Sequence, residues 1–142
     1  MYQFLEASVA DCMSQTVKTV TGSLTLHDLQ GRFEADQING YPVVEDDEVV
    51  GFVTAIDFLK AFILTPASMV PRYDDLMEKT VAEVMTSAFI YVGSATKLTR
   101  VLQLMVDHRL RSIPVLEPDR RLVGIVSRKD IMRALQASTA SG

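Results

Sequence analysis

The residues of this chain that are best suited to chemistry occur twice, in the heptapeptides GFVTAID (residues 51–57) and GIVSRKD (residues 124–130). Each contains a glycine, a hydroxyl side chain and, three residues after the hydroxyl, a carboxylate. At the start of a helix, such a pair forms a capping box, because the hydroxyl accepts a backbone N–H and the acid lies at the positive end of the helix dipole. The same groups could instead hold a ligand that carries hydroxyls or phosphate. The heptapeptides alone leave both interpretations open.

Both heptapeptides belong to a longer internal repeat. The segment VADCMS (residues 9–14) resembles VAEVMT (residues 81–86), and Pro42 of YPVV corresponds to Pro114 of IPVL at the same separation. The heptapeptides lie one residue further apart. The additional residue falls in a polar turn between two apolar runs, where an insertion is easily accommodated. Two copies in the same order indicate a duplicated structural unit.

Each copy predicts the element order β-α-β-β-α. In the second copy, apolar residues recur with a helical period from Leu98 to Val106. The other elements expected there are strands at 89–92, 113–116 and 122–126 and a helix at about 128–135. The first copy follows with strands at 17–20, 41–44 and 49–53 and helices around 26–33 and 58–63. Gly31 and Gly40 predict that its first helix is weaker and shorter than its counterpart.

We therefore expect an α+β chain of two βαββα repeats, each with a three-stranded sheet that leaves an apolar face to bury. Because a unit of about 60 residues is marginally stable alone, the repeats should pack together with pseudo-two-fold symmetry. Pro66 and Pro71 interrupt the helical pattern between them. The expected divisions are a first repeat with its lead-in (1–64), a linker (65–75), a second repeat (76–136) and a disordered tail (137–142).

Composition excludes several classes of function. The chain has 142 residues, 48% of them hydrophobic, and a net charge of -4, which argues against binding to nucleic acid or an anionic membrane. No apolar run approaches the roughly 20 residues that span a bilayer, and the N-terminus lacks the features of a signal peptide, so we expect a cytoplasmic location. Cys12 is the only cysteine, which excludes an internal disulfide. We expect no metal site and no catalytic residues.

The repeated pattern resembles the tandem cystathionine-β-synthase (CBS) domain, whose paired copies form a Bateman module. The resemblance rests on an entry that ends in Met-Ser or Met-Thr, an apolar-Pro-apolar strand, a hairpin and the repeated heptapeptide, and it extends from about Val9 to Leu135. It implies binding of an adenine nucleotide, of AMP, ADP or ATP type, or of S-adenosylmethionine, in clefts between the copies. It implies no required cofactor.

The resemblance also implies roles for individual residues. Thr54 and Ser127 would bond to phosphate or ribose. Asp57 and Asp130 would accept from the two ribose hydroxyls, which offer a carboxylate a pair of donors. The backbone would approach the ligand closely at the two motif glycines, Gly51 and Gly124. The walls of the clefts would come from the first strand and the proline strand of each copy, at Val17, Thr19, Tyr41, Pro42, Phe89, Tyr91, Ile113 and Pro114.

The two copies differ in charge before the proline strand. HRLR (residues 108–111) stands in the second copy where DQIN (residues 36–39) stands in the first. His108, Arg109 and Arg111 are similar to basic residues that meet phosphate in several members of the family. We therefore expect either a single dominant nucleotide or one tight and one weak site.

Together these features predict a non-enzymatic regulatory module that senses adenine nucleotides, in the manner of an energy sensor, and signals occupancy to a protein that the sequence does not identify. The resemblance also implies a homodimer that associates through its helices, which the apolar helix faces at Phe58, Phe62 and Ile131 would permit. The alternative is a protein-interaction or dimerisation module that binds no nucleotide and in which both motifs only cap helices. A small hydrolase would need a nucleophile and base in register, which the sequence does not offer.

Overall fold

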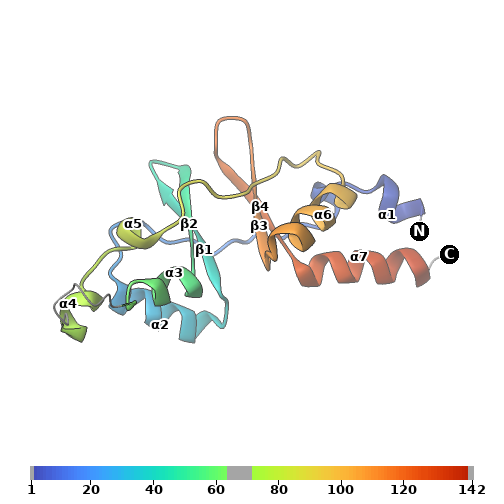
Figure 1. Cartoon of the computed structure of the whole chain (residues 1–142). Helices are drawn as coiled ribbons and strands as arrows, with labels where there is room; N and C mark the ends of the chain where they lie inside the picture. The colour runs from blue at the N-terminus through green and yellow to red at the C-terminus, as the bar shows by residue number, and fades with distance from the viewer. Residues whose placement is uncertain (1, 64–71, 141–142) are drawn as a thin grey trace. The chain divides into compact units, whose positions relative to one another are not determined.

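The computed structural model describes residues 2–63 and 72–140. Its helices and strands follow one another in nearly the same order in both copies (Figure 1). Along the first copy they are α1 (Tyr2–Glu6), the 3₁₀ turn η1 (Val9–Asp11), α2 (Leu26–Asp36), β1 (Gly40–Glu45), β2 (Glu48–Thr54) and α3 (Ala55–Lys60). Along the second they are α4 (Tyr73–Met77), α5 (Val81–Val84), α6 (Leu98–His108), β3 (Ser112–Leu116), β4 (Leu122–Ser127) and α7 (Arg128–Ala140).

The chain forms two compact units, and neither is a continuous repeat. The first-repeat unit is Lys18–Phe89, and the second-repeat unit combines Met1–Val17 with Ile90–Gly142. The lead-in of each repeat therefore belongs to the unit built on the other repeat. The lead-in segment VADCMS lies in the second-repeat unit and VAEVMT lies in the first-repeat unit. Part of the expected linker lies outside the described residues, and α4 begins within the rest of it.

Each unit contains an antiparallel hairpin with the same irregularity. β1 pairs with β2 and β3 pairs with β4, and the register shifts between Val43 and Val44 in one hairpin and between Val115 and Leu116 in the other. In the first hairpin the two turn residues, Asp46 and Asp47, have φ of 50° and 65°. Positive φ at both positions gives the tight turn whose twist matches that of the strands.

The prediction of three-stranded sheets was wrong, because the first strand of each copy is reduced to one bridging residue. Val20 donates to the carbonyl of Pro42 at 3.1 Å and accepts from Val44 at 2.9 Å, and Val92 is placed in the same way beside β3. A turn begins with the next residue in each case, with Gly22-Ser23 and Ser94-Ala95 at its centre, so the chain leaves the sheet after one parallel contact. The described sheets are two-stranded.

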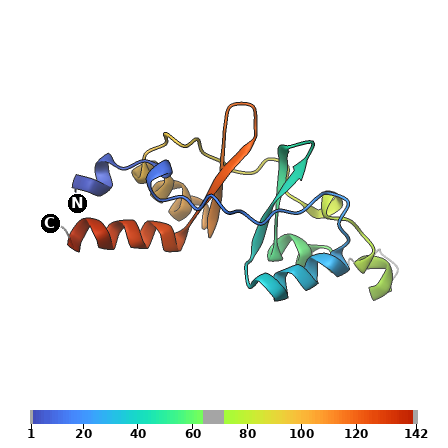
Figure 2. The same ribbon diagram turned by 180° about the vertical axis from the view of Figure 1, so that it is seen from behind.

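The helices correct two further expectations. α2 has 11 residues and so does α6, although a shorter α2 was predicted. Gly31 lies on the exposed side of α2, where a side chain would have no neighbour within 4 Å. The glycine therefore lowers the stability of the helix only through its weak helix propensity, and the helix keeps its full length. α7 extends to Ala140 through most of the predicted tail. Ser138 is buried there and accepts a hydrogen bond from the backbone of Phe4 at 3.2 Å, which holds α1 beside the end of α7 (Figures 1 and 2).

Each unit has its own core, completed by the lead-in of the other repeat. In the first-repeat unit, Met77 and Val81 close a core that is otherwise made by residues of the first repeat, namely Val20, Leu26, Leu29, Tyr41, Val43 and Val53. In the second-repeat unit, Phe4 and Val9 close a core that is otherwise made by Val92, Leu98, Val101, Met105, Ile113, Val115, Val126 and Ile131. Of the apolar positions predicted from the period of α6, Leu98, Val101 and Met105 are confirmed as its buried face, whereas Val106 is 66% exposed.

Candidate functional site

Both heptapeptides form the capping box that their spacing predicts. The N–H and hydroxyl of Thr54 donate to Oδ2 of Asp57 at 2.9 and 3.1 Å, and the N–H of Asp57 donates back to the Thr54 hydroxyl at 3.2 Å. The N–H and hydroxyl of Ser127 donate to Oδ2 of Asp130 at 2.8 and 3.0 Å, with a return bond of 3.3 Å. These bonds fix the direction of each carboxylate and use only one of its two oxygens.

The hydrogen bonding of the second carboxylate oxygen, Oδ1, differs between the repeats. In the first-repeat unit, the hydroxyl of Thr86 donates to Oδ1 of Asp57 at 3.2 Å, and Asp57 is only 6% exposed. The residue that corresponds to Thr86 is Ser14, whose hydroxyl donates instead to the carbonyl of Thr16 at 3.3 Å. Among residues 2–63 and 72–140, none donates a hydrogen bond to Oδ1 of the half-buried Asp130.

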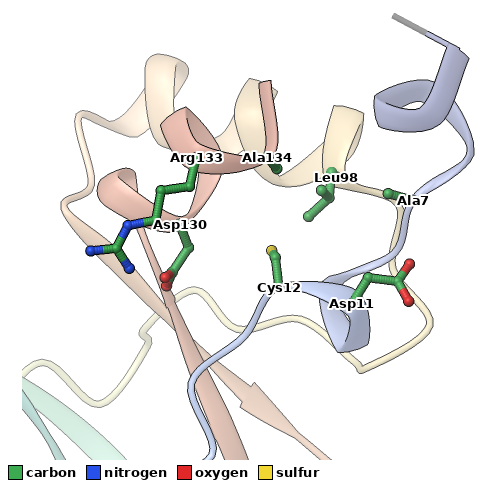
Figure 3. A pocket seen from close by; sticks show the side chains of 7 residues that line it. All are labelled: Ala7, Asp11, Cys12, Leu98, Asp130, Arg133 and Ala134. Atoms are coloured by element: carbon green, nitrogen blue, oxygen red, sulfur yellow. The ribbon is translucent and has the colours of Figure 1, made fainter. Parts of the chain in front are cut away.

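Asp130 lines a pocket in the second-repeat unit, between α7 and the lead-in of the first repeat (Figure 3). The other lining residues are Ala7, Asp11, Cys12, Leu98, Arg133 and Ala134. Burial, and secondarily the negative charges of Asp130 and Asp11, raise the pKa of the Cys12 thiol to about 11. Cys12 is therefore protonated near neutral pH and is a poor nucleophile there.

The motif glycines allow a close approach by the protein's own chain. A Cβ on Gly51 would lie 2.5 Å from Sδ of Met85, and a Cβ on Gly124 would lie 2.7 Å from Sδ of Met13 and 2.8 Å from the carbonyl of Ser14. The lead-in methionine of the other repeat thus covers each glycine. At Gly124 the backbone carbonyl of Ser14 leaves no room for a side chain, whereas at Gly51 a side chain would have to displace the flexible Met85. The predicted approach of a ligand to these glycines stays a prediction.

A comparison with protein families decides what the two repeats are. The model of the CBS domain matches residues 9–64 and 81–137, which together make up most of the chain. This protein belongs to the CBS domain family. It contains a tandem pair of CBS repeats, as the resemblance implied, in an α+β fold.

Relatives of this CBS pair include proteins named only for their CBS domains. The chloroplastic CBS domain-containing protein CBSX1 of Arabidopsis thaliana is 30% identical over 127 residues, which cover 75% of this chain and 54% of CBSX1. The chain thus spans about half the length of that relative. Enzymes also occur among the relatives, since the match to inosine-5'-monophosphate dehydrogenase of Haemophilus influenzae covers 23% of that enzyme.

Two solved structures of CBS pairs contain adenosyl ligands. The crystal structure of CBSX2 in complex with AMP matches with a TM-score of 0.78 and 25% identity, over 93% of this chain and 98% of that one. The CBS domain pair of protein MJ0100, in complex with 5'-methylthioadenosine and S-adenosyl-L-methionine, matches with a TM-score of 0.75 and 25% identity, again over 93% and 98%.

Within residues 2–63 and 72–140, the CBS pair has neither a membrane-spanning helix nor a cluster of side chains suited to a metal ion. No helix within these residues is long and apolar enough to cross a membrane. In the same part of the chain, no three His, Cys, Asp or Glu side chains gather so that they could hold a metal ion.

The residues expected to wall a ligand site fall into two groups. Tyr41 and Ile113 are fully buried in the cores of their own units, while Pro42 and Pro114, the next residues along the strands, point to the opposite face. The others lie at or near the surface: Val17, Thr19 and Phe89 are half-buried, and Tyr91 is 46% exposed with the guanidinium of Arg120 5.5 Å from its ring.

Tyr41 is further held by a polar network that the sequence did not indicate. Its hydroxyl donates to Oδ2 of Asp36 at 2.6 Å, and Nζ of Lys18 lies 2.8 Å from Oδ1 of the same carboxylate. The bonds from Lys18 and Tyr41 lower the pKa of Asp36, while burial and the bond to Asp36 raise the pKa of Tyr41 well above its usual range. Asp36 is the counterpart of His108, so the first CBS repeat uses this position to fix its own core tyrosine.

The basic segment of the second CBS repeat is held at its backbone by Arg128. His108, Arg109 and Arg111 are all exposed, and Arg109 ends α6 with φ of 55°. Arg128 donates from Nε to the carbonyl of Leu110 at 2.8 Å and from Nη2 to that of Arg109 at 3.2 Å. Its backbone N–H also donates to the carbonyl of Arg111 at 3.0 Å.

The sequence alone did not indicate this contact of Arg128. A difference between the repeats could have indicated the contact, because the first repeat has Ala55 at the position that corresponds to Arg128. Ala55 keeps the backbone bond, to Asn39 at 3.0 Å, but has no side chain to reach the preceding carbonyls.

Proposed function

We propose that this chain is a regulatory module that binds an adenine nucleotide at a strand-to-helix turn of its CBS pair and passes occupancy to another protein. The observation that carries the proposal is Asp130, a carboxylate fixed by Ser127 through Oδ2 and with Oδ1 left to accept from a ligand. It stands in a chain whose family includes structures in complex with AMP and with S-adenosyl-L-methionine.

The chemistry of adenosyl compounds suits such a carboxylate. Their ribose carries two adjacent hydroxyls, and an ionised carboxylate accepts from such donors in short, charge-assisted bonds. The exposed Arg109 and Arg111 lie in the segment whose carbonyls are bound by Arg128. Arg128 is the residue directly after Ser127 in the chain. The positive charge of Arg109 and Arg111 favours a ligand with phosphate, which makes AMP, ADP or ATP a better candidate than S-adenosylmethionine.

Signalling in this proposal is a population shift. A ligand changes the balance of two arrangements of the protein only by its different affinity for each. We propose a homodimer without enzymatic activity, and the regulated protein is to be identified by experiment. The cytoplasmic location expected from the sequence stays a prediction.

A competing function is a protein-interaction or dimerisation module without a nucleotide. A specific observation favours it, since both motif carboxylates already cap their helices and need no ligand to do so. Under this alternative Asp57 and Asp130 would act only on stability.

Thermal unfolding of the full chain separates the two functions. We expect AMP, ADP or ATP to raise the unfolding temperature, because a ligand at about one hundred times its Kd adds roughly 2.7 kcal/mol to the stability of the state that binds it. GMP at equal concentration is the control for general effects of nucleotide charge. If AMP, ADP, ATP, S-adenosylmethionine and 5'-methylthioadenosine all leave the unfolding temperature unchanged, the interaction module is the better account.

A further inference from the structure

We infer that Thr86 makes the two CBS turns unequal, so that a ribose binds tightly at Asp130 and only weakly at Asp57. In this view, the hydroxyl of Thr86 occupies the carboxylate oxygen of Asp57 that a ribose hydroxyl would need. The inference rests on the proposed function and goes further, because it assigns the tight site to one repeat and names a residue outside both motifs that sets the difference.

In the first-repeat unit, the carboxylate of Asp57 is satisfied on both oxygens. Thr54 donates to Oδ2 and Thr86 donates to Oδ1, and the side chain is almost completely buried. A ribose hydroxyl that bonds to Oδ1 must first displace the hydroxyl of Thr86. The exchange replaces one hydrogen bond by another and therefore gains little.

In the second-repeat unit, the same capping bonds leave the carboxylate open. Oδ2 of Asp130 accepts from Ser127, and within the described chain no group donates to Oδ1. Asp130 is half-buried and is one of the residues that line the pocket of Figure 3. A ribose hydroxyl can bond to this oxygen without displacing a protein group.

The difference comes from one side chain, because the backbones match. Thr86 exchanges two backbone bonds with Phe52, both 2.9 Å, and Ser14 exchanges two with Ile125, at 2.8 and 2.9 Å. The strand and the lead-in are therefore joined in the same way in both units. The hydroxyl of Thr86 turns to the carboxylate, whereas the hydroxyl of Ser14 turns to the carbonyl of Thr16.

Isothermal titration calorimetry of the full chain with AMP tests the assignment. We expect Asp130→Asn to weaken the tight step at least tenfold and Asp57→Asn to leave that step within twofold of wild type. Asparagine keeps one oxygen for the capping bonds, so both variants retain a capped helix. A 2',3'-dideoxy analogue of AMP should bind wild type at least tenfold more weakly than AMP.

Thr86→Val tests the role of the hydroxyl itself, since valine has nearly the same shape and no donor. In the Asp130→Asn background, we expect it to strengthen the remaining AMP site about threefold to tenfold, the value of one displaced hydrogen bond. Ser14→Ala is the matched control and should leave AMP binding unchanged. If Asp130→Asn does not fold, Thr86→Val alone decides, because it must tighten the weak step and leave the tight step as it is.

The possible failures are distinct. If wild type binds none of the adenosyl compounds, the proposed function is wrong and this inference falls with it. If AMP binds but Asp57→Asn removes the tight step, or if Thr86→Val leaves the weak step unchanged, only the inequality of the two turns is overturned.

Discussion

At the scale of single residues, the pKa of Cys12 depends on burial and on two neighbouring carboxylates of the second-repeat unit. Burial and the carboxylates of Asp130 and Asp11 raise its pKa from 9.0 to about 11. At pH 8 its thiolate is therefore roughly a hundredfold scarcer than that of an unperturbed thiol. We expect labelling by a thiol-reactive disulfide such as DTNB to be slower by about that factor than in urea. The rate should rise tenfold per pH unit and level off only near pH 11.

The charge of Asp130 can be separated from burial by mutation. Asp130→Asn removes one of the two negative charges, which lowers the pKa of Cys12 and should accelerate labelling at pH 8. Asp119→Asn is the matched control, because it removes the same charge from a distant exposed turn of the same unit. Equal labelling rates in wild type and Asp130→Asn would show that the charge of Asp130 does not protect the thiol.

The sequence predicted the motif residues but not the state of their carboxylates. Thr54 and Asp57, and likewise Ser127 and Asp130, were readable because a capping box depends on local spacing. The contact of Thr86 with Asp57 was not, because the two lie 29 residues apart and the corresponding Ser14 carries the same functional group. Only the fold decides which acceptor each hydroxyl meets.

Among the elements, the turn between α6 and β3 has the clearest role for a test. Arg128 binds the carbonyls of Leu110 and Arg109 with its planar fork. We expect Arg128→Ala to weaken AMP binding about threefold to tenfold and adenosine binding far less, because the loosened segment carries the cations that, in the proposed function, would meet phosphate. Calorimetry with the two ligands measures the difference.

Two further variants sharpen this test. Arg128→Lys keeps the charge but cannot reach two carbonyls at once, so it should behave more like alanine than like wild type. Lys129→Ala removes a charge from the same helical turn and is the control for a general electrostatic effect. The positioning role is refuted if AMP and adenosine lose the same affinity in Arg128→Ala.

The elements also show which patterns in the sequence were sufficient. α6 was predicted from its apolar period, and β3 and β4 from two apolar runs around a turn, because these signals are repeated over several residues. The first strand of each copy was overestimated, since a short β-like run does not reveal that a turn follows its only bridging residue. The length of α2 was underestimated because a solvent-facing glycine costs a helix only about 1 kcal/mol.

At the scale of the whole molecule, the exchange of lead-ins is the property that the sequence could not give. An internal repeat specifies the order of elements but not which copy a segment joins. VADCMS is adjacent to the first repeat in the chain and yet packs in the unit of the second. Stability is therefore distributed so that the core of each unit depends on residues from the other repeat.

Val81 and Val9 offer a matched test of this exchange. Both are fully buried lead-in residues at corresponding positions, Val81 in the core of the first-repeat unit and Val9 in that of the second. Replacing either by alanine removes two buried methyl groups and leaves a cavity, at a cost of about 2 kcal/mol. We expect Val81→Ala to accelerate amide hydrogen exchange chiefly in β1 and β2, and Val9→Ala to do so chiefly in β3 and β4, because local openings follow the packing of each unit.

The two variants control for each other, since they make the same change at corresponding positions of the two lead-ins. Exchange in the sheet of the unaffected unit should stay close to wild type in each case. If Val81→Ala instead loosened β3 and β4, the lead-in would stabilise the repeat that follows it in sequence. The cores would then be continuous repeats, and the contact of Thr86 with Asp57, which depends on the exchange, could not persist.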